Sequence, residues 1–169
     1  MRKLLLAGLL LPFLAFTLIE WTPVQLDEKY TVAFPGEPKK ATDENGTSLW
    51  TLEATDSNTV YLAMLIDFTK LGLDSSTMAV VLTQPEFFDE YQKGILGKLP
   101  NGKLVSSTTG EYKGYPVTNY KFTMKEGAVT YYSKNFFIGT RVYSLSYLQK
   151  KDQVESAERD RFFGSFNLR

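Results

Sequence analysis

The segment TVYLAMLIDF, residues 59–68, decides the fold. Its apolar positions form two alternate sets, which are Val60, Leu62, Met64, Ile66 and Phe68 on one side and Tyr61, Ala63 and Leu65 on the other. Successive side chains of a strand point to opposite faces, so a strand of this composition is covered on both faces. The sequence therefore predicts an interior strand with protein packed on each side of its sheet.

Further strands follow from short turns on either side of this segment. Residues 47–54 alternate and are joined to it by the polar turn at 56–58. Later in the chain, two-residue turns containing glycine separate four more expected strands, at 103–112, 115–124, 128–138 and 141–149. Such short connections force neighbouring strands to run antiparallel.

A helix is predicted over residues 84–99. Thr83 and Glu86 have the spacing of a capping box, and Pro85 suits a first helical turn. One apolar stripe then recurs every three to four residues, formed by Phe87, Phe88, Tyr91, Ile95 and Leu99. This stripe is expected to face the sheet.

A second helix is predicted near the end of the chain, from Asp152, with Glu155 completing a capping box, to about residues 162–164. Near the start, residues 29–34 (KYTVAF) form a further strand that Pro35 and Gly36 end. Residues 21–28 read as an irregular lead-in, and residues 70–78 as a long loop.

These elements predict an α+β fold: an antiparallel sheet of about six or seven strands sandwiched between helices, in the order βββ-α-ββββ-α. Residues 21–169 are of the length of a single domain with one core.

Residues 1–20 have the layout of an export segment. Arg2 and Lys3 precede an unbroken apolar run at 4–19. The run favours a cleaved signal peptide, because 16 residues of helix span about 24 Å, which is less than the ~30 Å of a bilayer core. Retention as an N-terminal anchor is the alternative. We therefore expect an exported protein, periplasmic or associated with the cell envelope, that meets the membrane only through this segment if it stays uncleaved.

The amino-acid composition excludes several kinds of catalytic and metal-binding site. The chain has no cysteine and no histidine, which removes disulfides, thiol nucleophiles, the Ser-His-Asp triad and the usual zinc ligands. The chain carries 19 basic and 19 acidic residues. Two of the basic residues and one of the acidic residues lie in 1–20, so residues 21–169 hold 17 basic and 18 acidic residues. A nearly neutral domain does not attract nucleic acid. We expect no cofactor, no metal and no nucleic-acid partner.

Several segments together resemble a known family. They are the export segment, YTVAFPGEP at 30–38, Gly114-Tyr115-Pro116 and GTRVYSL at 139–145 in the four-strand meander, and RFFGSF at 161–166. In this order they resemble exported bacterial proteins of PsbP-like fold, an antiparallel sheet between helices named for an extrinsic protein of photosystem II. The resemblance implies a non-enzymatic, accessory role. Plant members are associated with metal ions through histidine and acidic side chains, and this chain has no histidine to take those positions.

Two groups of residues are candidates for function. Tyr131, Tyr132, Phe136 and Phe137 crowd the last hairpin and are a possible binding surface for a peptide, glycan or lipid, unless alternation buries them in the core. Asp67 is the carboxylate to watch, because a buried acid has a raised pKa or needs a cation. The ordinary alternative is an acid that points to solvent or pairs with a lysine such as Lys70.

The sequence thus favours an exported, non-enzymatic binding or accessory module that contacts a protein or an apolar ligand of the cell envelope. Two alternatives remain: a carboxylate-based hydrolase or metal-dependent enzyme that uses Asp67, and a membrane-tethered structural protein. A concave pocket that holds Asp67 and a second acid would favour the enzyme.

Overall fold

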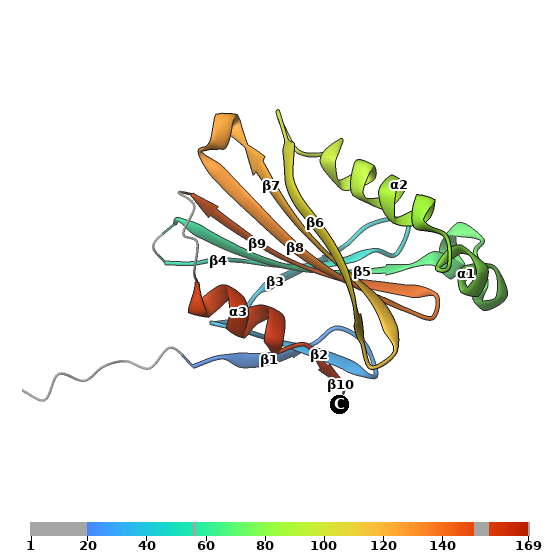
Figure 1. The fold of residues 1–169 in the computed structure, drawn as a ribbon. Helices are drawn as coiled ribbons and strands as arrows, with labels where there is room; N and C mark the ends of the chain where they lie inside the picture. The colour runs from blue at the N-terminus through green and yellow to red at the C-terminus, as the bar shows by residue number, and fades with distance from the viewer. Residues whose placement is uncertain (1–19, 56, 151–155, 169) are drawn as a thin grey trace, which may run out of the picture.

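A seven-stranded antiparallel sheet forms the centre of the molecule, in the order β3-β4-β5-β9-β8-β7-β6 (Figure 1). We describe residues 20–55, 57–150 and 156–168 of a computed structural model. The strands of this sheet are β3 (Lys39–Thr42), β4 (Ser48–Glu53), β5 (Thr59–Asp67), β6 (Lys103–Tyr112), β7 (Tyr115–Met124), β8 (Val129–Ile138) and β9 (Arg141–Lys150). The predicted fold class is confirmed, and the four strands of the meander begin and end within one residue of their expected positions.

The strand β5 is an interior strand, as predicted, and pairs with β4 on one side and β9 on the other. Its two faces are not equally covered. Thr59, Tyr61 and Ala63 are buried on the first face, whereas the alternate side chains Val60, Leu62, Met64 and Ile66 are only half-buried on the second. The prediction of full cover on both faces is therefore correct for one face only.

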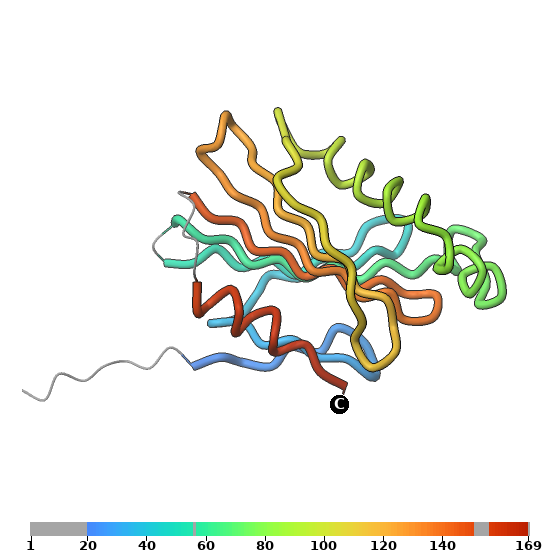
Figure 2. Tube along the Cα trace, in the orientation of Figure 1, coloured from blue at the N-terminus to red at the C-terminus, as the bar shows by residue number. Residues whose placement is uncertain are grey.

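A second, small sheet covers the first face. It has the order β1-β2-β10, formed by β1 (Thr22–Gln25), β2 (Tyr30–Phe34) and β10 (Asn167–Leu168), and α3 (Ala157–Gly164) lies beside it (Figure 1). The tube trace shows the end of the described chain running beside β2 (Figure 2). Side chains from both sheets and α3 meet in one core, which includes Tyr61, Phe136, Leu145, Phe162 and Phe166.

Two expectations about this layer are wrong. The lead-in at 21–28 contains the strand β1, which pairs with β2 even though it includes Pro23. The strand at 29–34 is present but belongs to the small sheet, and β3, which was not predicted, takes the outer place in the large one. Proline is tolerated in β1 because this is an edge strand with a free side.

The helices α1 (Ser75–Val81) and α2 (Pro85–Leu96) cover part of the second face (Figure 1). The expected loop at 70–78 thus includes the end of a short 3-10 turn (Phe68–Leu71) and the first half of α1. Asp74 begins α1 by accepting hydrogen bonds from the amide of Thr77 and the hydroxyl of Ser76, which hold the pKa of Asp74 at about 2.

The predicted capping box of α2 does not form. The residue before the helix is Gln84, whose side chain makes no capping bond, and the Thr83 hydroxyl instead donates to the Val80 carbonyl at 2.7 Å. The apolar stripe does face the sheet at Phe87 and Tyr91, whose rings contact Phe137.

The predicted start of the last helix at Asp152 and its capping partner Glu155 lie outside the described residues. Within them, α3 is capped by the Ser156 hydroxyl, which accepts from the amide of Arg159 at 3.2 Å, and it continues to Gly164. The apolar run at 4–19 also lies outside the described residues. None of the helices in the described part of the chain is long and apolar enough to cross a membrane.

Candidate functional site

Four segments meet at the end of the sheet where the β8–β9 hairpin turns. They are the loop between β1 and β2, the end of β5, the start of β9 and the β6–β7 hairpin. The Arg141 guanidinium joins the first three of them: Nη1 lies 2.8 Å from Asp27 Oδ2 and 2.8 Å from Glu28 Oε1, and Nε lies 3.4 Å from Asp67 Oδ2. We call these four residues the arginine latch.

Asp27 is the most enclosed acid of the arginine latch, with a side chain only 6% exposed. Its Oδ1 accepts hydrogen bonds from the amides of Lys29 (2.9 Å) and Tyr30 (2.8 Å), which fold the chain into the turn that starts β2. Its Oδ2 accepts from the Tyr143 hydroxyl as well as from Arg141. The loop is therefore fixed to the main sheet through one carboxylate.

Asp67 ends β5 directly opposite Arg141 of β9. Its Oδ1 accepts from both the amide (3.0 Å) and the hydroxyl (2.6 Å) of Thr69, and these bonds begin the 3-10 turn. Its ion-pair partner is Arg141, not Lys70 as one reading of the sequence suggested. Asp67 thus has a cation partner, and its side chain is still 21% exposed.

Both aspartates are held in the ionised form. Burial by itself would raise the pKa of Asp27, but the bonds from Tyr143, from the two amides and from Arg141 outweigh it and lower the pKa. Burial also opposes ionisation of Asp67, where the two bonds from Thr69 and the charge of Arg141 again lower the pKa. The pKa of Tyr143, whose hydroxyl donates to Asp27, is raised. Burial is the largest cause, followed by the hydrogen bond to Asp27 and the negative charge of that carboxylate.

A cleft of about 530 Å³ opens over the arginine latch. Its lining includes Tyr30, Tyr143 and Tyr115, together with Asp67, Glu28 and Arg141. Tyr115 is 40% exposed and projects from the β6–β7 hairpin, while Tyr30 and Tyr143 are buried beneath it. The cleft does contain Asp67 and a second acid, Glu28, which is the arrangement expected of the enzyme alternative, but Arg141 is bound to both.

The proposed aromatic surface is wrong for two of its four residues. Phe136 and Phe137 are 1% and 0% exposed and lie in the cores on opposite faces of the sheet. Tyr131 is half-buried, and its hydroxyl bonds to that of Ser146 at 2.6 Å. Tyr132 is half-buried with the Arg159 guanidinium 4.5 Å from its ring centroid. These four residues do not form one surface, because alternation places neighbours on opposite faces.

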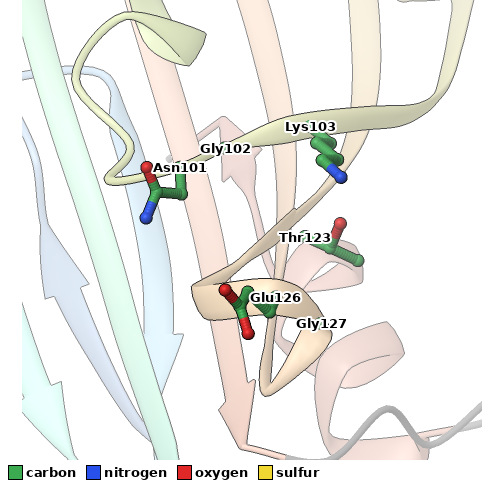
Figure 3. A pocket seen from close by; sticks show the side chains of 6 residues that line it. All are labelled: Asn101, Gly102, Lys103, Thr123, Glu126 and Gly127. Carbon is green, nitrogen blue, oxygen red and sulfur yellow. The ribbon is translucent and has the colours of Figure 1, made fainter.

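A second hollow, of about 650 Å³, lies at the other end of the β6–β7–β8 meander (Figure 3). Asn101, Gly102 and Lys103 form one side of it, and Thr123, Glu126 and Gly127 form the other. Only one carboxylate lines it. Among the described residues, no group of three or more acidic side chains is placed to hold a metal ion.

Comparison with known proteins identifies the fold. The structure is similar to the solution structure of cyanobacterial PsbP (CyanoP) from Synechocystis sp. PCC 6803, with a TM-score of 0.57 over 92% of this chain and 96% of that one. The chain has a PsbP-like fold. Sequence identity to CyanoP is only 6%, so the PsbP-like architecture is shared although few side chains are the same.

A second structural neighbour is LpqN, described as involved in cell envelope biogenesis of Mycobacterium tuberculosis. It matches with a TM-score of 0.50 and 16% identity, over 88% of this chain and 90% of that one. No protein-family model matches the sequence, and a search of curated proteins finds no relative. The likeness therefore establishes the PsbP-like fold, and the site must be read from this chain's own residues.

Sequence reasoning found Asp67 but missed the rest of the arginine latch. The hairpin turn at Gly139 and Thr140 places Arg141 opposite Ile138, whereas its position opposite Asp67 depends on the pairing of β9 with β5. Asp67 and Arg141 are 74 positions apart, and no local pattern in the sequence predicts that pairing. Asp27 gave no signal either, since it lies 114 positions from Arg141 in a segment without periodic pattern.

Proposed function

We propose that this protein is an exported, non-enzymatic accessory module of the cell envelope that binds a partner protein in the cleft over the arginine latch. The export-like residues 1–20 support the location. The envelope role named for LpqN, a protein of the same fold, is consistent with it.

The observation that carries the proposal is the lining of the cleft. An exposed tyrosine, Tyr115, stands beside two buried tyrosines and an arginine, and these residue types contribute most to binding at protein interfaces. The arginine latch holds the surrounding loops in place before a partner arrives. A preorganised site loses less conformational entropy on binding.

The carboxylates of the cleft support binding over catalysis. A general acid or base works best when its pKa lies near the operating pH. The pKa of Asp67, which lines the cleft, and that of Asp27, which is bound to Arg141, are both lowered, so both groups are ionised and paired with Arg141 near neutral pH. Glu28 has a lowered pKa as well, because its own amide and then Arg141 stabilise the charge.

The test is crosslinking of the exported protein in the cells that make it. A photoreactive residue at position 115 should give one adduct of defined mass with another protein, and the same residue at Val105, which is also exposed and lies toward the other end of β6, should not. With the photoreactive residue moved to position 69 in the same cleft, Tyr115→Ala should reduce the adduct at least about fivefold, since a tyrosine anchor at an interface contributes more than about 1 kcal/mol.

Two results would overturn the proposal. Adducts of equal yield with another protein from positions 115 and 105 would mean that the cleft has no preferred partner. Turnover of an ester, phosphate or glycoside that Asp67→Asn abolishes would make the cleft a carboxylate-based active site instead.

A further inference from the structure

The strand β6 is one outer edge of the large sheet (Figure 1). It has ten residues, and those at 103–111 are all exposed. In the part of the chain that the structure describes, β7 is the only strand that pairs with it. The outer edge of β6 therefore presents backbone N–H and C=O groups that a further strand can pair with.

The other described edges of the two sheets carry features that discourage such pairing. The strand β3 has four residues, two of which are Lys39 and Lys40. The strand β1 contains Pro23, and β10 has only two residues. Short length, lysine and proline are features by which proteins protect an exposed strand edge. By this comparison β6 is the exception.

Protection of β6 is confined to its first residues. Lys103 begins the strand, and the pairing register with β7 shifts between Leu104 and Ser106, which marks a bulge. From Ser106 to Tyr112 the register is unbroken, and this stretch holds neither lysine nor proline. We call residues 106–112 the open edge. It is a regular template for an antiparallel partner strand.

The turn of the β6–β7 hairpin determines which backbone groups of the open edge point outward. Lys113 and Gly114 have φ values of 50° and 81°, as in a two-residue type I′ turn. The residues that flank such a turn, Tyr112 and Tyr115, form a hydrogen-bonded pair, and bonded pairs then alternate along the ladder. The residues between the bonded ones direct their N–H and C=O groups away from β7: Ser107, Thr109 and Glu111.

The open edge is complementary to a second copy of itself. Its middle residue is Thr109, and a two-fold axis at this residue places Thr109 opposite Thr109 of the second copy and Ser107 opposite Glu111. Both pairs join residues whose backbone groups point outward, as an antiparallel ladder requires. Glu111 is the one charged residue of the open edge, and in this register its carboxylate faces a hydroxyl donor instead of a second carboxylate.

The side chains of the open edge favour a second copy over a foreign strand. Sheet edges that capture a foreign segment select it through pockets for alternate side chains. Here the residues at 106–110 are serine, threonine and glycine, all exposed, and their hydroxyl groups can pair with the same groups of another copy. Two-fold dimers are also the commonest soluble oligomers, and their interfaces bring the same patch of both copies together.

We propose that the protein forms a two-fold dimer in which the open edges of two copies pair antiparallel about Thr109. The two seven-stranded sheets then become one continuous sheet. A single pair of strands is a small interface, so the dimer is reversible. The open edge contributes no residue to the lining of the cleft over the arginine latch. The dimer therefore goes beyond the proposed function and can fail or succeed independently of it.

The first test uses single cysteines, because the chain has none of its own. Directly opposed residues of an antiparallel pair have Cα atoms about 4.5–5.5 Å apart, which a disulfide can bridge. Under mild oxidation Thr109→Cys should give at least about tenfold more covalent dimer than Thr42→Cys on the other outer strand, β3, because pairing raises the effective concentration of the thiols. Ser107→Cys and Glu111→Cys should each give little dimer alone and a heterodimer when mixed.

The second test measures the equilibrium itself. Sedimentation equilibrium of the exported protein should show a reversible monomer–dimer equilibrium. Thr109→Lys should raise the dissociation constant at least about fivefold, because two like charges then face each other across the axis. The matched change Thr42→Lys on β3 should leave the constant unchanged. A melting temperature equal to that of the parent, measured at a dilution where both are monomers, shows that Thr109→Lys still folds.

Each other outcome contradicts the proposal. A parent that stays monomeric at every concentration would exclude the dimer. Equal disulfide yields from positions 109 and 42 would indicate random collision, and the lack of a heterodisulfide between positions 107 and 111 would exclude the register about Thr109. Equal weakening by the two lysine substitutions would reveal an effect of net charge alone. A crosslink between two copies has twice the mass of the chain, which distinguishes the dimer from a partner protein captured in the cleft.

Discussion

The two faces of the large sheet are built differently. On the α3 side, 14 buried side chains form one core, in which aromatic rings from β2, β5, β9 and α3 contact each other. On the α2 side the described core is smaller: Phe68, Met78, Phe137 and Val142 form one cluster, and Tyr120, Phe122 and Met124 are buried on the same face of β7. The helix α2 has no fully buried residue. The difference indicates that the small sheet and α3 stabilise the fold, and that α2 is held less firmly.

Polar side chains explain the weaker packing on the α2 side. Asn135, which is fully buried, donates to Thr118 Oγ1 at 3.2 Å and accepts from Ser133 Oγ at 3.0 Å and Tyr91 Oη at 3.4 Å. Hydrogen bonds of this kind contribute a net 0.5–1.5 kcal/mol each, roughly the worth of one or two methylene groups. They fix the position of Tyr91 more than they add stability.

The largest expected effect is a loss of stability that differs between two phenylalanine-to-alanine variants, one on each face. Phe162→Ala removes a ring of 0% exposure that contacts Phe34, Tyr61 and Phe163, and it should lower the free energy of unfolding by about 3–5 kcal/mol. Phe87→Ala makes the same chemical change on the half-buried stripe of α2 and should lower it by about 2 kcal/mol or less. Urea titration of both variants measures the difference, and equal losses would contradict the comparison of the faces.

The arginine latch should make the α3 side sensitive to acid. Asp27→Asn should lower the free energy of unfolding by about 1–3 kcal/mol at pH 7, because it leaves Arg141 and Tyr143 without a charged acceptor.

The pH dependence has a definite sign. The pKa of Asp27 is lower in the folded protein than in the unfolded chain, so its contribution is complete above the unfolded value of about 4 and is lost as the pH falls through the folded value. The melting temperatures of parent and Asp27→Asn should therefore draw together as the pH falls below about 4. A gap that stays constant through this acid range would mean that the ion pair does not contribute.

The sequence predicts the meander on the large sheet better than it predicts the small sheet. The meander β6–β9 was placed correctly because Gly114, Gly127 and Gly139, each with positive φ, mark its turns. The small sheet was missed because its strands are short and pair over long range: β10 has two residues, and Leu168 pairs with Tyr30. Such contacts leave no periodic signal in a single chain.

The residues of the candidate site also differ in how well the sequence predicts them. Asp67 was found because a charge in an apolar strand is a local anomaly. Arg141 and Asp27 were not, because nothing local marks them until β5 pairs with β9 and the loop before β2 reaches Arg141.

Removal of the N-cap of α3 should have a smaller effect on the free energy of unfolding. The Ser156 hydroxyl accepts from the Arg159 amide and also bonds to the Tyr147 hydroxyl at 3.1 Å. Ser156→Ala should lower the free energy of unfolding by about 1 kcal/mol, which is typical of a lost N-cap. Ser156→Asp or Ser156→Asn, which can still accept from the amide, should lose less than alanine in the same urea titration. An alanine variant as stable as the parent would show that the cap does not hold α3.

The smallest effect is expected at the corresponding place on the α2 side. Thr83 and Glu86 have the sequence of a capping box, yet the Thr83 hydroxyl donates to Val80 and the helix begins at Pro85 without a side-chain cap. Thr83→Ala should therefore change the free energy of unfolding by less than about 0.5 kcal/mol, because the bond it removes is exposed at the end of α1. A loss near 1 kcal/mol, shared by Glu86→Ala, would mean that the box does form in solution. In that case α2 would be capped as α3 is, and the contrast between the two faces would rest on side-chain packing alone.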